Sequence, residues 1–169
     1  AQWLAAGLID GAPLDSSIGV VDEHPYLRGQ ERLTFARIGL TDPLSLDDYE
    51  AHGGWTGLRR ALDMDSAAMV QTVLDSGLRG RGGAAFPAGI KWQTVLAQNA
   101  AQKYVVCNAD EGDSGTFSDR LLMESDPYTL IEGMVIAGLA VQATQGFIYV
   151  RTEYPHSIAV LQTAIERAQ

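Results

Sequence analysis

The sequence predicts a layered α/β domain preceded by an extended arm. Two short apolar segments, residues 104–107 and 147–150, have the character of β-strands. The helical patterns between them are long enough for the crossover that parallel strands require. With 169 residues, 46% hydrophobic and 20% charged, the chain has the composition of one globular domain or part of one. We expect the domain to cover residues 45–169 and the arm to cover residues 1–44.

The arm mixes glycine, proline, aspartate and serine with short apolar pieces and shows no sustained periodicity, which is typical of a linker. No signal peptide is expected, and the apolar run over residues 130–143 is too short and too interrupted to span a membrane. The chain begins at Ala1 and ends inside a helical pattern at Gln169. We therefore expect both ends to continue in a longer polypeptide.

Helical patterns follow from residue 45 onward, and several have a clear beginning or end. Ser45 can cap the first helix, Gly77 can end the third, and Asp119 can cap a short helix after the first strand. Pro127 begins a longer helix. The predicted helices begin at residue 46, cover 58–64, 66–76 and 88–97, begin again after Asp119, and cover 127–144 and 155–168.

The charges leave one positive region in an acidic chain. A formal net charge of −9 argues against nucleic acid or an anionic membrane as a partner. Residues 77–108 contain no acid, but they contain Arg79, Arg81, Lys91 and Lys103. Residues 77–86, here called the glycine loop, hold Gly77, Gly80, Gly82 and Gly83 ahead of a helix, a pattern that suits phosphate binding. The alternative is a flexible turn with solvated arginines.

Two common nucleotide motifs do not fit the glycine loop. An ordinary Rossmann fingerprint requires a strand before the loop, whereas the preceding residues have helical period. A Walker loop would need its lysine nearer than Lys91, which is followed by tryptophan. Phe86 can stack on a flat heterocycle and Lys91 can neutralise a phosphate, with core packing as the alternative for Phe86 and Trp92.

Residues 108–116, here called the acidic loop, directly follow the first predicted strand. Ligands of open α/β sheets bind outside the carboxyl ends of strands, which places Asn108, Asp110, Glu111 and Asp113 well for binding sugar or ribityl hydroxyls. The alternative is a solvated turn that caps the next helix. The loop lacks the spacing of an EF-hand calcium site.

The sequence gives little support for a metal site or for nucleophilic catalysis. The three histidines are far apart, and Ser114 has no histidine nearby in sequence, which disfavours a zinc site and a serine hydrolase. Cys107 is expected to be a buried thiol. As the one cysteine, it allows no internal disulfide or multi-thiolate cluster and favours a reducing, cytoplasmic location. We predict no catalytic acid or base and no metal ligand.

Four blocks in order strongly resemble the NADH-oxidising flavoprotein family: GLRGRGGAAFPAGIKW (77–92), VCNADE (106–111), GTFSDR (115–120) and LIEGM (130–134). The family includes the FMN-bearing subunit of respiratory complex I, the diaphorase subunit of NAD-reducing hydrogenases and the beta subunit of NAD-dependent formate dehydrogenases. The resemblance implies a layered FMN-binding domain, Rossmann-like but not standard. In it, hydride passes between NAD(H) and FMN, and electrons leave through iron–sulfur clusters.

The resemblance also implies roles for individual residues. The glycine loop would lie along FMN and the dinucleotide, Phe86 would stack on NAD(H), and Lys91 would contact the flavin or its phosphate. The acidic loop would hold FMN, and Asp113 would replace a glutamate that lies beside the nicotinamide nucleotide in complex I. The implied cofactor-binding residues are Gly80, Arg81, Gly82, Gly83, Phe86, Lys91, Asn108, Asp110, Glu111 and Asp113.

Residues 111–115, Glu-Gly-Asp-Ser-Gly, are similar to the formate dehydrogenase and hydrogenase branches. We therefore expect a subunit of an NAD-dependent formate dehydrogenase, whose partners would be a [2Fe–2S] subunit and a molybdenum or tungsten subunit. The equivalent subunit of a hydrogenase or of complex I is the alternative. A non-catalytic nucleotide-binding or subunit-assembly module is the alternative from another class.

The family's Cys-Gly-Glu-Glu block and its four-cysteine [4Fe–4S] motif do not occur in these 169 residues. The cluster ligands are therefore expected outside this chain. We predict that the chain is an incomplete part of the subunit and that alone it binds FMN weakly or not at all. The arm is similar to the linker that follows a thioredoxin-like [2Fe–2S] domain in related subunits.

Overall fold

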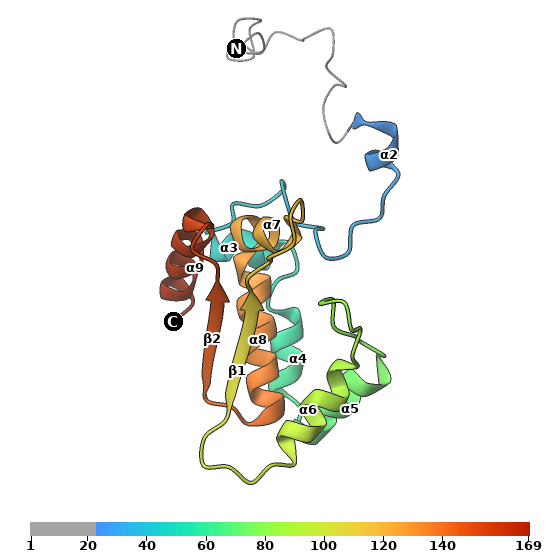
Figure 1. Ribbon diagram of the computed structural model, residues 1–169, viewed down its shortest axis with the longest axis vertical. Coiled ribbons are helices and arrows are strands. Elements are labelled where there is room, and N and C mark those ends of the chain that lie inside the picture. The colour runs from blue at the N-terminus through green and yellow to red at the C-terminus, as the bar shows by residue number, and fades with distance from the viewer. Residues whose placement is uncertain (1–22) are drawn as a thin grey trace, which may run out of the picture. The chain divides into compact units, whose positions relative to one another are not determined.

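The computed structural model describes residues 23–169 (Figure 1). The chain divides into two compact units, Ala1–Ala36 and Arg37–Gln169. Of the first unit the structure describes residues 23–36, which hold the short helix α2 (Pro25–Arg28). Residues 1–22 of the predicted arm lie outside the described residues. The boundary predicted at residue 44 stays a prediction, although Arg37 and the residues after it group with the second unit.

The second unit is a mixed α/β structure, as predicted. Pro155–Ala168 has the predicted bounds, and the other predicted helices are found with ends shifted by one to three residues. Its elements are α3 (Leu46–Ala51), α4 (Thr56–Leu62), α5 (Ser66–Asp75), α6 (Ala88–Leu96), β1 (Tyr104–Ala109), α7 (Ser118–Ser125), α8 (Pro127–Val141), β2 (Gln145–Val150) and α9 (Pro155–Ala168).

The two strands pair in parallel, from Tyr104 opposite Gln145 to Ala109 opposite Val150. Helices α7 and α8 form the crossover between them, which confirms the predicted parallel arrangement. Both strands are two residues longer than predicted. The expectation that the first strand is buried is wrong for one face, because Val106 is 64% exposed while Cys107 packs into the core. Among the described residues, helices cover one face of the sheet.

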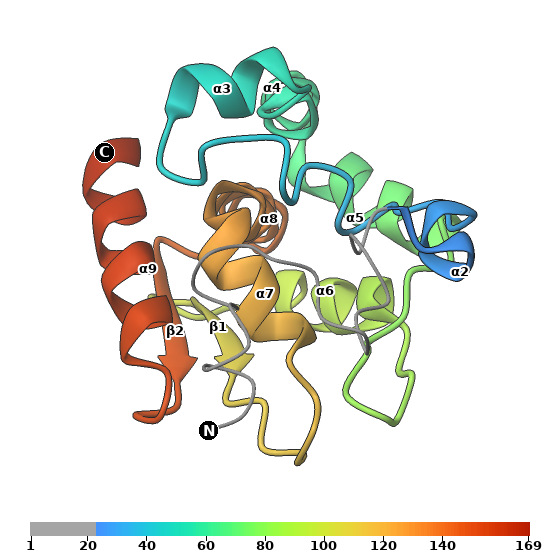
Figure 2. The same cartoon turned by 90° about the horizontal axis from the view of Figure 1, so that it is seen from above.

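Helix α8 is the centre of the second unit (Figure 2). It packs against α4, α5 and α6 on one side and against α7, α9 and the strands on others. Such a helix is apolar around most of its circumference, and it buries Ala137, Ala140 and Val141. Helix α8 thus supports both strands, and the acidic loop begins at the carboxyl end of the first.

The helix starts show where the sequence predicts local structure well and where it does not. Ser45 caps α3 as predicted, since its Oγ accepts a hydrogen bond from the Asp48 amide at 3.1 Å. The prediction that Asp119 caps α7 is wrong, because the helix begins at Ser118 and Asp119 lies within its first turn. The carboxylate that contacts these amides belongs to Glu111.

The helices in the described part of the chain are each too short or too polar to cross a membrane.

Candidate functional site

The glycine loop is closed at its base by two backbone hydrogen bonds. The Gly80 amide donates to the Phe86 carbonyl at 2.9 Å, and the Ala88 amide donates to the Leu78 carbonyl at 2.8 Å. Gly83, at the tip, has a φ of +94°, a conformation that side chains disfavour. These bonds hold the ends of the loop together, so the peptide groups between them project from the α5–α6 pair.

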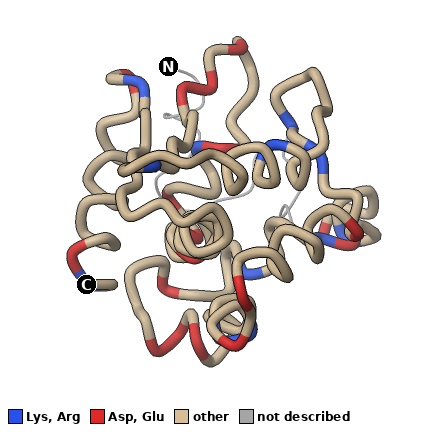
Figure 3. The backbone as a smooth tube through the Cα atoms, turned by 90° about the horizontal axis from the view of Figure 1, so that it is seen from below, with Lys and Arg blue, Asp and Glu red and all other residues tan. Residues whose placement is uncertain are grey.

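The cations of the loop bond to backbone carbonyls. Arg79 Nη1 donates to the Ala85 carbonyl at 3.1 Å, and Arg81 Nη1 donates to the Arg79 carbonyl at 2.7 Å. Within residues 23–169 neither arginine forms an ion pair, and neither does Lys91. Figure 3 shows where the lysines and arginines and the aspartates and glutamates of the described residues lie along the backbone. An anion bound here would therefore displace no carboxylate of the described residues from these cations.

Phe86 and Lys91 lie together beside the loop. The Lys91 ammonium is 5.6 Å from the centroid of the Phe86 ring, which is 46% exposed. Core packing is thus wrong as the interpretation of Phe86. It is right for Trp92, which packs against the cluster that includes Met69 and Val70. An exposed ring beside an ammonium group can bind a planar, negatively charged ligand.

The space around the loop fits a phosphate-bearing group such as FMN. A Cβ added to Gly82 would meet no described atom within 4 Å, and the same holds for Gly83. All residues of the glycine loop are exposed. The loop and the helix after it therefore present open backbone and three cations, and a Cβ at Gly82 would enter open space rather than the packed fold.

The acidic loop begins at the carboxyl end of β1, where its first two residues are still part of the strand. Asn108 Oδ1 accepts a hydrogen bond from the Asp110 amide at 3.2 Å, and the Asp113 carbonyl accepts one from the Thr116 amide at 3.2 Å. The carboxylates of Asp110 and Asp113 form no ion pair within the described part of the chain. They are available to accept hydrogen bonds from hydroxyls.

Glu111 differs from its neighbours because its carboxylate already accepts hydrogen bonds from other residues of the protein. Oε1 accepts from the Asp119 amide at 2.7 Å, and Oε2 accepts from the Arg120 amide at 2.9 Å and from the Tyr154 hydroxyl at 3.2 Å. Desolvation raises the pKa of Glu111, but these hydrogen bonds outweigh it and the net pKa is lowered. The prediction that Glu111 holds FMN stays a prediction. The contacts of its carboxylate in the structure are to α7 and Tyr154.

Two residues at this end of the sheet escaped the sequence-based predictions. Arg151 Nη1 donates to the Glu111 carbonyl at 2.9 Å, and Tyr154 donates to the carboxylate of the same residue. Both follow closely after β2. The signal that could find them is their position after the second predicted strand, because ligands of such sheets bind outside the carboxyl ends of strands.

The glycine loop and the acidic loop form two separate sets of contacts. Figures 1 and 2 show the glycine loop rising from the α5–α6 pair toward the end of the sheet at which the acidic loop begins. The structure joins Gly80 to Phe86 within one loop and Asn108 to Asp110 within the other. Between residues 77–91 and residues 108–116 it contains no hydrogen bond or ion pair.

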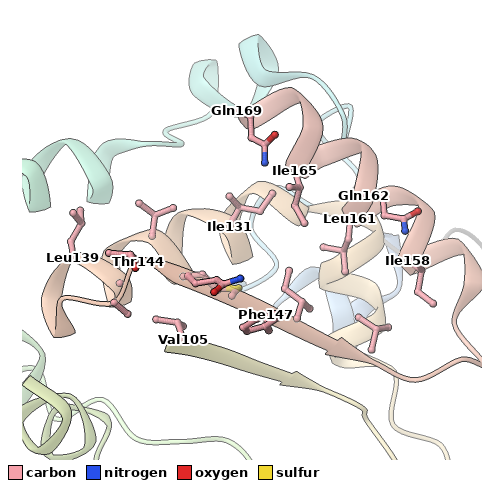
Figure 4. Close-up of a pocket in the computed structure, with 18 residues that line it drawn as sticks. Val105, Ile131, Leu139, Thr144, Phe147, Ile158, Leu161, Gln162, Ile165 and Gln169 are labelled. Carbon is pink, nitrogen blue, oxygen red and sulfur yellow. The ribbon is translucent and has the colours of Figure 1, made fainter. Parts of the chain in front are cut away.

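A cavity of about 780 Å³ lies elsewhere, between α8, β2 and α9 (Figure 4). Its lining is mostly apolar, with Ile131, Leu139 and Phe147 among its residues, and it includes no charged side chain. None of the ten predicted cofactor-binding residues lines it. Because no lysine or arginine lines it to balance the charge of a phosphate, we do not assign the cofactor to this cavity.

The remaining reactive side chains offer little chemistry. Desolvation, and next the charge of Asp119, raise the pKa of the Cys107 thiol, which makes it a poor nucleophile. Ser114 is exposed, and no histidine among residues 23–169 bonds to it. In the residues that the structure describes, no group of three histidine, cysteine, aspartate or glutamate side chains is arranged to hold a metal ion.

Comparison with known proteins gives one family. Residues 73–169 match the family described as the Nuo51 FMN-binding domain. The chain is 50% identical over 140 residues to the HndC component of the NADP-reducing hydrogenase of Solidesulfovibrio fructosivorans, covering 83% of this chain and 28% of that one. It is 46% identical over 125 residues to an NADH-quinone oxidoreductase subunit of Aquifex aeolicus, covering 74% of this chain and 29% of that one.

A solved structure agrees with these relatives. The crystal structure of an NAD⁺-reducing [NiFe]-hydrogenase in the air-oxidized state superposes with a TM-score of 0.63 at 34% identity, covering 82% of this chain and 22% of the hydrogenase chain. This likeness confirms the predicted α/β fold class, and the family match confirms FMN as the predicted cofactor. The chain spans less than a third of the length of these relatives.

Proposed function

The chain belongs to the Nuo51 FMN-binding domain family, and we propose that it forms the first part of the flavin and nicotinamide site of a diaphorase-type subunit. In this role the subunit transfers hydride between NAD(H) and FMN. The observation that carries the proposal is the glycine loop with its open backbone at Gly82. Nearby are three cations, Arg79, Arg81 and Lys91, that form no ion pair among the described residues.

The residues of the chain bind and orient rather than react. The glycine loop and Lys91 would hold phosphate, Phe86 would stack on the nicotinamide nucleotide, and the acidic loop would accept hydrogen bonds from ribityl or ribose hydroxyls. Bound FMN supplies the capacity to accept a hydride and to release electrons singly. Hydride transfer itself needs no acid or base from the protein. We therefore assign no catalytic residue to this chain.

The proposal also names the enzyme complex to which the subunit belongs. We propose an NAD-dependent formate dehydrogenase, on the likeness of residues 111–115 to that branch. Its partners would be a [2Fe–2S] subunit and a molybdenum or tungsten subunit, and its [4Fe–4S] ligands would lie outside these residues. The relatives named above are hydrogenase and NADH-quinone oxidoreductase subunits, so a hydrogenase or complex I is the alternative. The lone Cys107 supports a reducing, cytoplasmic location.

The experiment is Gly82→Val in the complete subunit with its partners. A Cβ at Gly82 would meet no described atom within 4 Å, so folding should be unchanged while FMN and NADH binding weaken by at least about tenfold. Gly133→Val, at an exposed and equally open position in α8, is the matched control and should bind as wild type. NADH binding that is unaffected by Gly82→Val would contradict the proposal. It would favour the subunit-assembly module.

A further inference from the structure

We propose that Tyr154 and Arg151 are positioning residues for the flavin and nicotinamide site. From the connection after β2, they hold Glu111 in the conformation that directs the acidic loop toward the ligand. The inference rests on the proposed function, and it assigns to that site two residues that would act on the ligand only through Glu111.

The backbone of Glu111 is in a disfavoured conformation. Its φ is +46°, in the left-handed region that residues with a side chain avoid. Such a conformation persists where the surrounding contacts determine it. Arg151 fixes the carbonyl through a 2.9 Å hydrogen bond, and the amides of Asp119 and Arg120 fix the carboxylate. The directions of Asp110 and Gly112, on either side, follow from this turn.

Tyr154 completes the set of contacts around Glu111. Its side chain is buried, at 6% exposed, and its hydroxyl donates to Glu111 Oε2 at 3.2 Å. The centre of its ring lies 5.2 Å from the guanidinium carbon of Arg120 and 5.5 Å from that of Arg151. These cation–π contacts set the ring position, so the hydroxyl is held toward Glu111 before any ligand arrives.

The arrangement lies where a binding site is expected. Ala109 and Val150 are paired neighbours at the ends of the two parallel strands, so the connection after β2 runs beside the acidic loop. Ligands of such sheets bind outside these ends. Misplacement of a binding group by about 1 Å can cost about a hundredfold in rate, so a buried contact that fixes the loop has a direct effect on function.

The test is Tyr154→Phe in the complete subunit with its partners. Removing the hydroxyl keeps the ring packing and takes one donor from Glu111. In the flavin-free protein, hydrogen exchange at the Asp119 and Arg120 amides should accelerate by about fivefold, the effect of one lost hydrogen bond. In the loaded protein, FMN should dissociate faster by a similar factor, and KM for NADH should rise more than kcat falls. Arg151→Lys, which loses the planar fork, should change these quantities in the same direction.

The matched control is Tyr104→Phe, the same chemical change at the amino end of β1, where the ring is 52% exposed. It should leave exchange in the acidic loop, FMN release and KM within about twofold of wild type. If wild type binds FMN and NADH while Tyr154→Phe matches this control, the positioning role is wrong and the proposed function stands. If wild type binds neither ligand, both are wrong.

Discussion

The Tyr49 hydroxyl donates a 2.5 Å hydrogen bond to Glu132 Oε2, which joins α3 to α8 inside the core. The same carboxylate accepts from the Trp55 amide at 2.9 Å and from the Leu58 amide at 2.8 Å, at the start of α4. Desolvation and the Glu132 hydrogen bond raise the pKa of Tyr49, so it remains a donor. A single buried carboxylate thus anchors two helices to the central one.

Removing this carboxylate should destabilise the domain. Glu132→Ala leaves three donors without their acceptor and should lower the free energy of unfolding by about 3 kcal/mol. Glu132→Gln keeps one acceptor oxygen and should cost about 2 kcal/mol. Denaturant unfolding of the complete subunit measures both. Glu166→Ala, on the exposed surface of α9, is the control and should change stability by less than about 0.5 kcal/mol. Equal stabilities of Glu132→Ala and the control would contradict the anchoring role.

Gly89 should be intolerant of the smallest side chain. A Cβ there would lie 2.7 Å from the Leu74 amide nitrogen and 2.8 Å from its Cα, so α5 and α6 would have to separate. Gly89→Ala should cost about 1–3 kcal/mol of unfolding free energy. Gly133→Ala, at an open position of α8, should instead stabilise by about 0.5–1 kcal/mol through helix propensity. The melting temperature should therefore fall for Gly89→Ala and rise for Gly133→Ala.

Lys91 should contribute charge to ligand binding. Lys91→Gln should weaken FMN or NADH binding by about fivefold to tenfold at low salt, and the loss should shrink as ionic strength rises. Lys103→Gln is the matched control, because Lys103 Nζ donates to the Leu96 carbonyl and lies just before the amino end of β1. A titration in which both variants lose the same affinity would show that net charge, and not the place of Lys91, determines binding.

The order of the acidic loop should depend on pH through Glu111. Its folded-state pKa is lowered from the ordinary value of 4.5, so the stabilisation is fully present above pH 4.5 and is lost as pH falls through the lowered value. Hydrogen exchange in residues 110–120 of the flavin-free protein should therefore accelerate on acidification beyond the intrinsic trend. Glu111→Gln removes this titration and should accelerate less over the same range, in which Asp119, whose pKa is raised by desolvation, still titrates. A wild-type acceleration no greater than that of the variant would contradict the prediction.

Much of the fold follows from local patterns in the sequence. Pro155 begins α9 and Ser45 caps α3 as expected, because the signals for a helix start lie within a few residues. The parallel pairing was predictable from the length of the crossover. The exposure of one sheet face was not, since Val106 and Tyr149 are apolar in composition and only the packing of other elements decides whether they are covered.

The candidate site was predictable in its residues and less so in its contacts. The glycines and cations of residues 77–91 signalled an anion site through composition alone. The cap of α7 by Glu111, eight residues before the Asp119 amide, is a tertiary contact, and the sequence suggested the nearer Asp119. The support from Tyr154 joins positions 43 residues apart, which no local pattern encodes.

If this chain forms part of a flavin site that reacts with NADH, the complete subunit should be coloured. The measurement is its visible absorption spectrum, taken on protein purified with its partners, before and after addition of NADH. We predict flavin bands that bleach when NADH is added. A protein that is colourless, and remains colourless after FMN is supplied, would contradict the account and favour a subunit-assembly module.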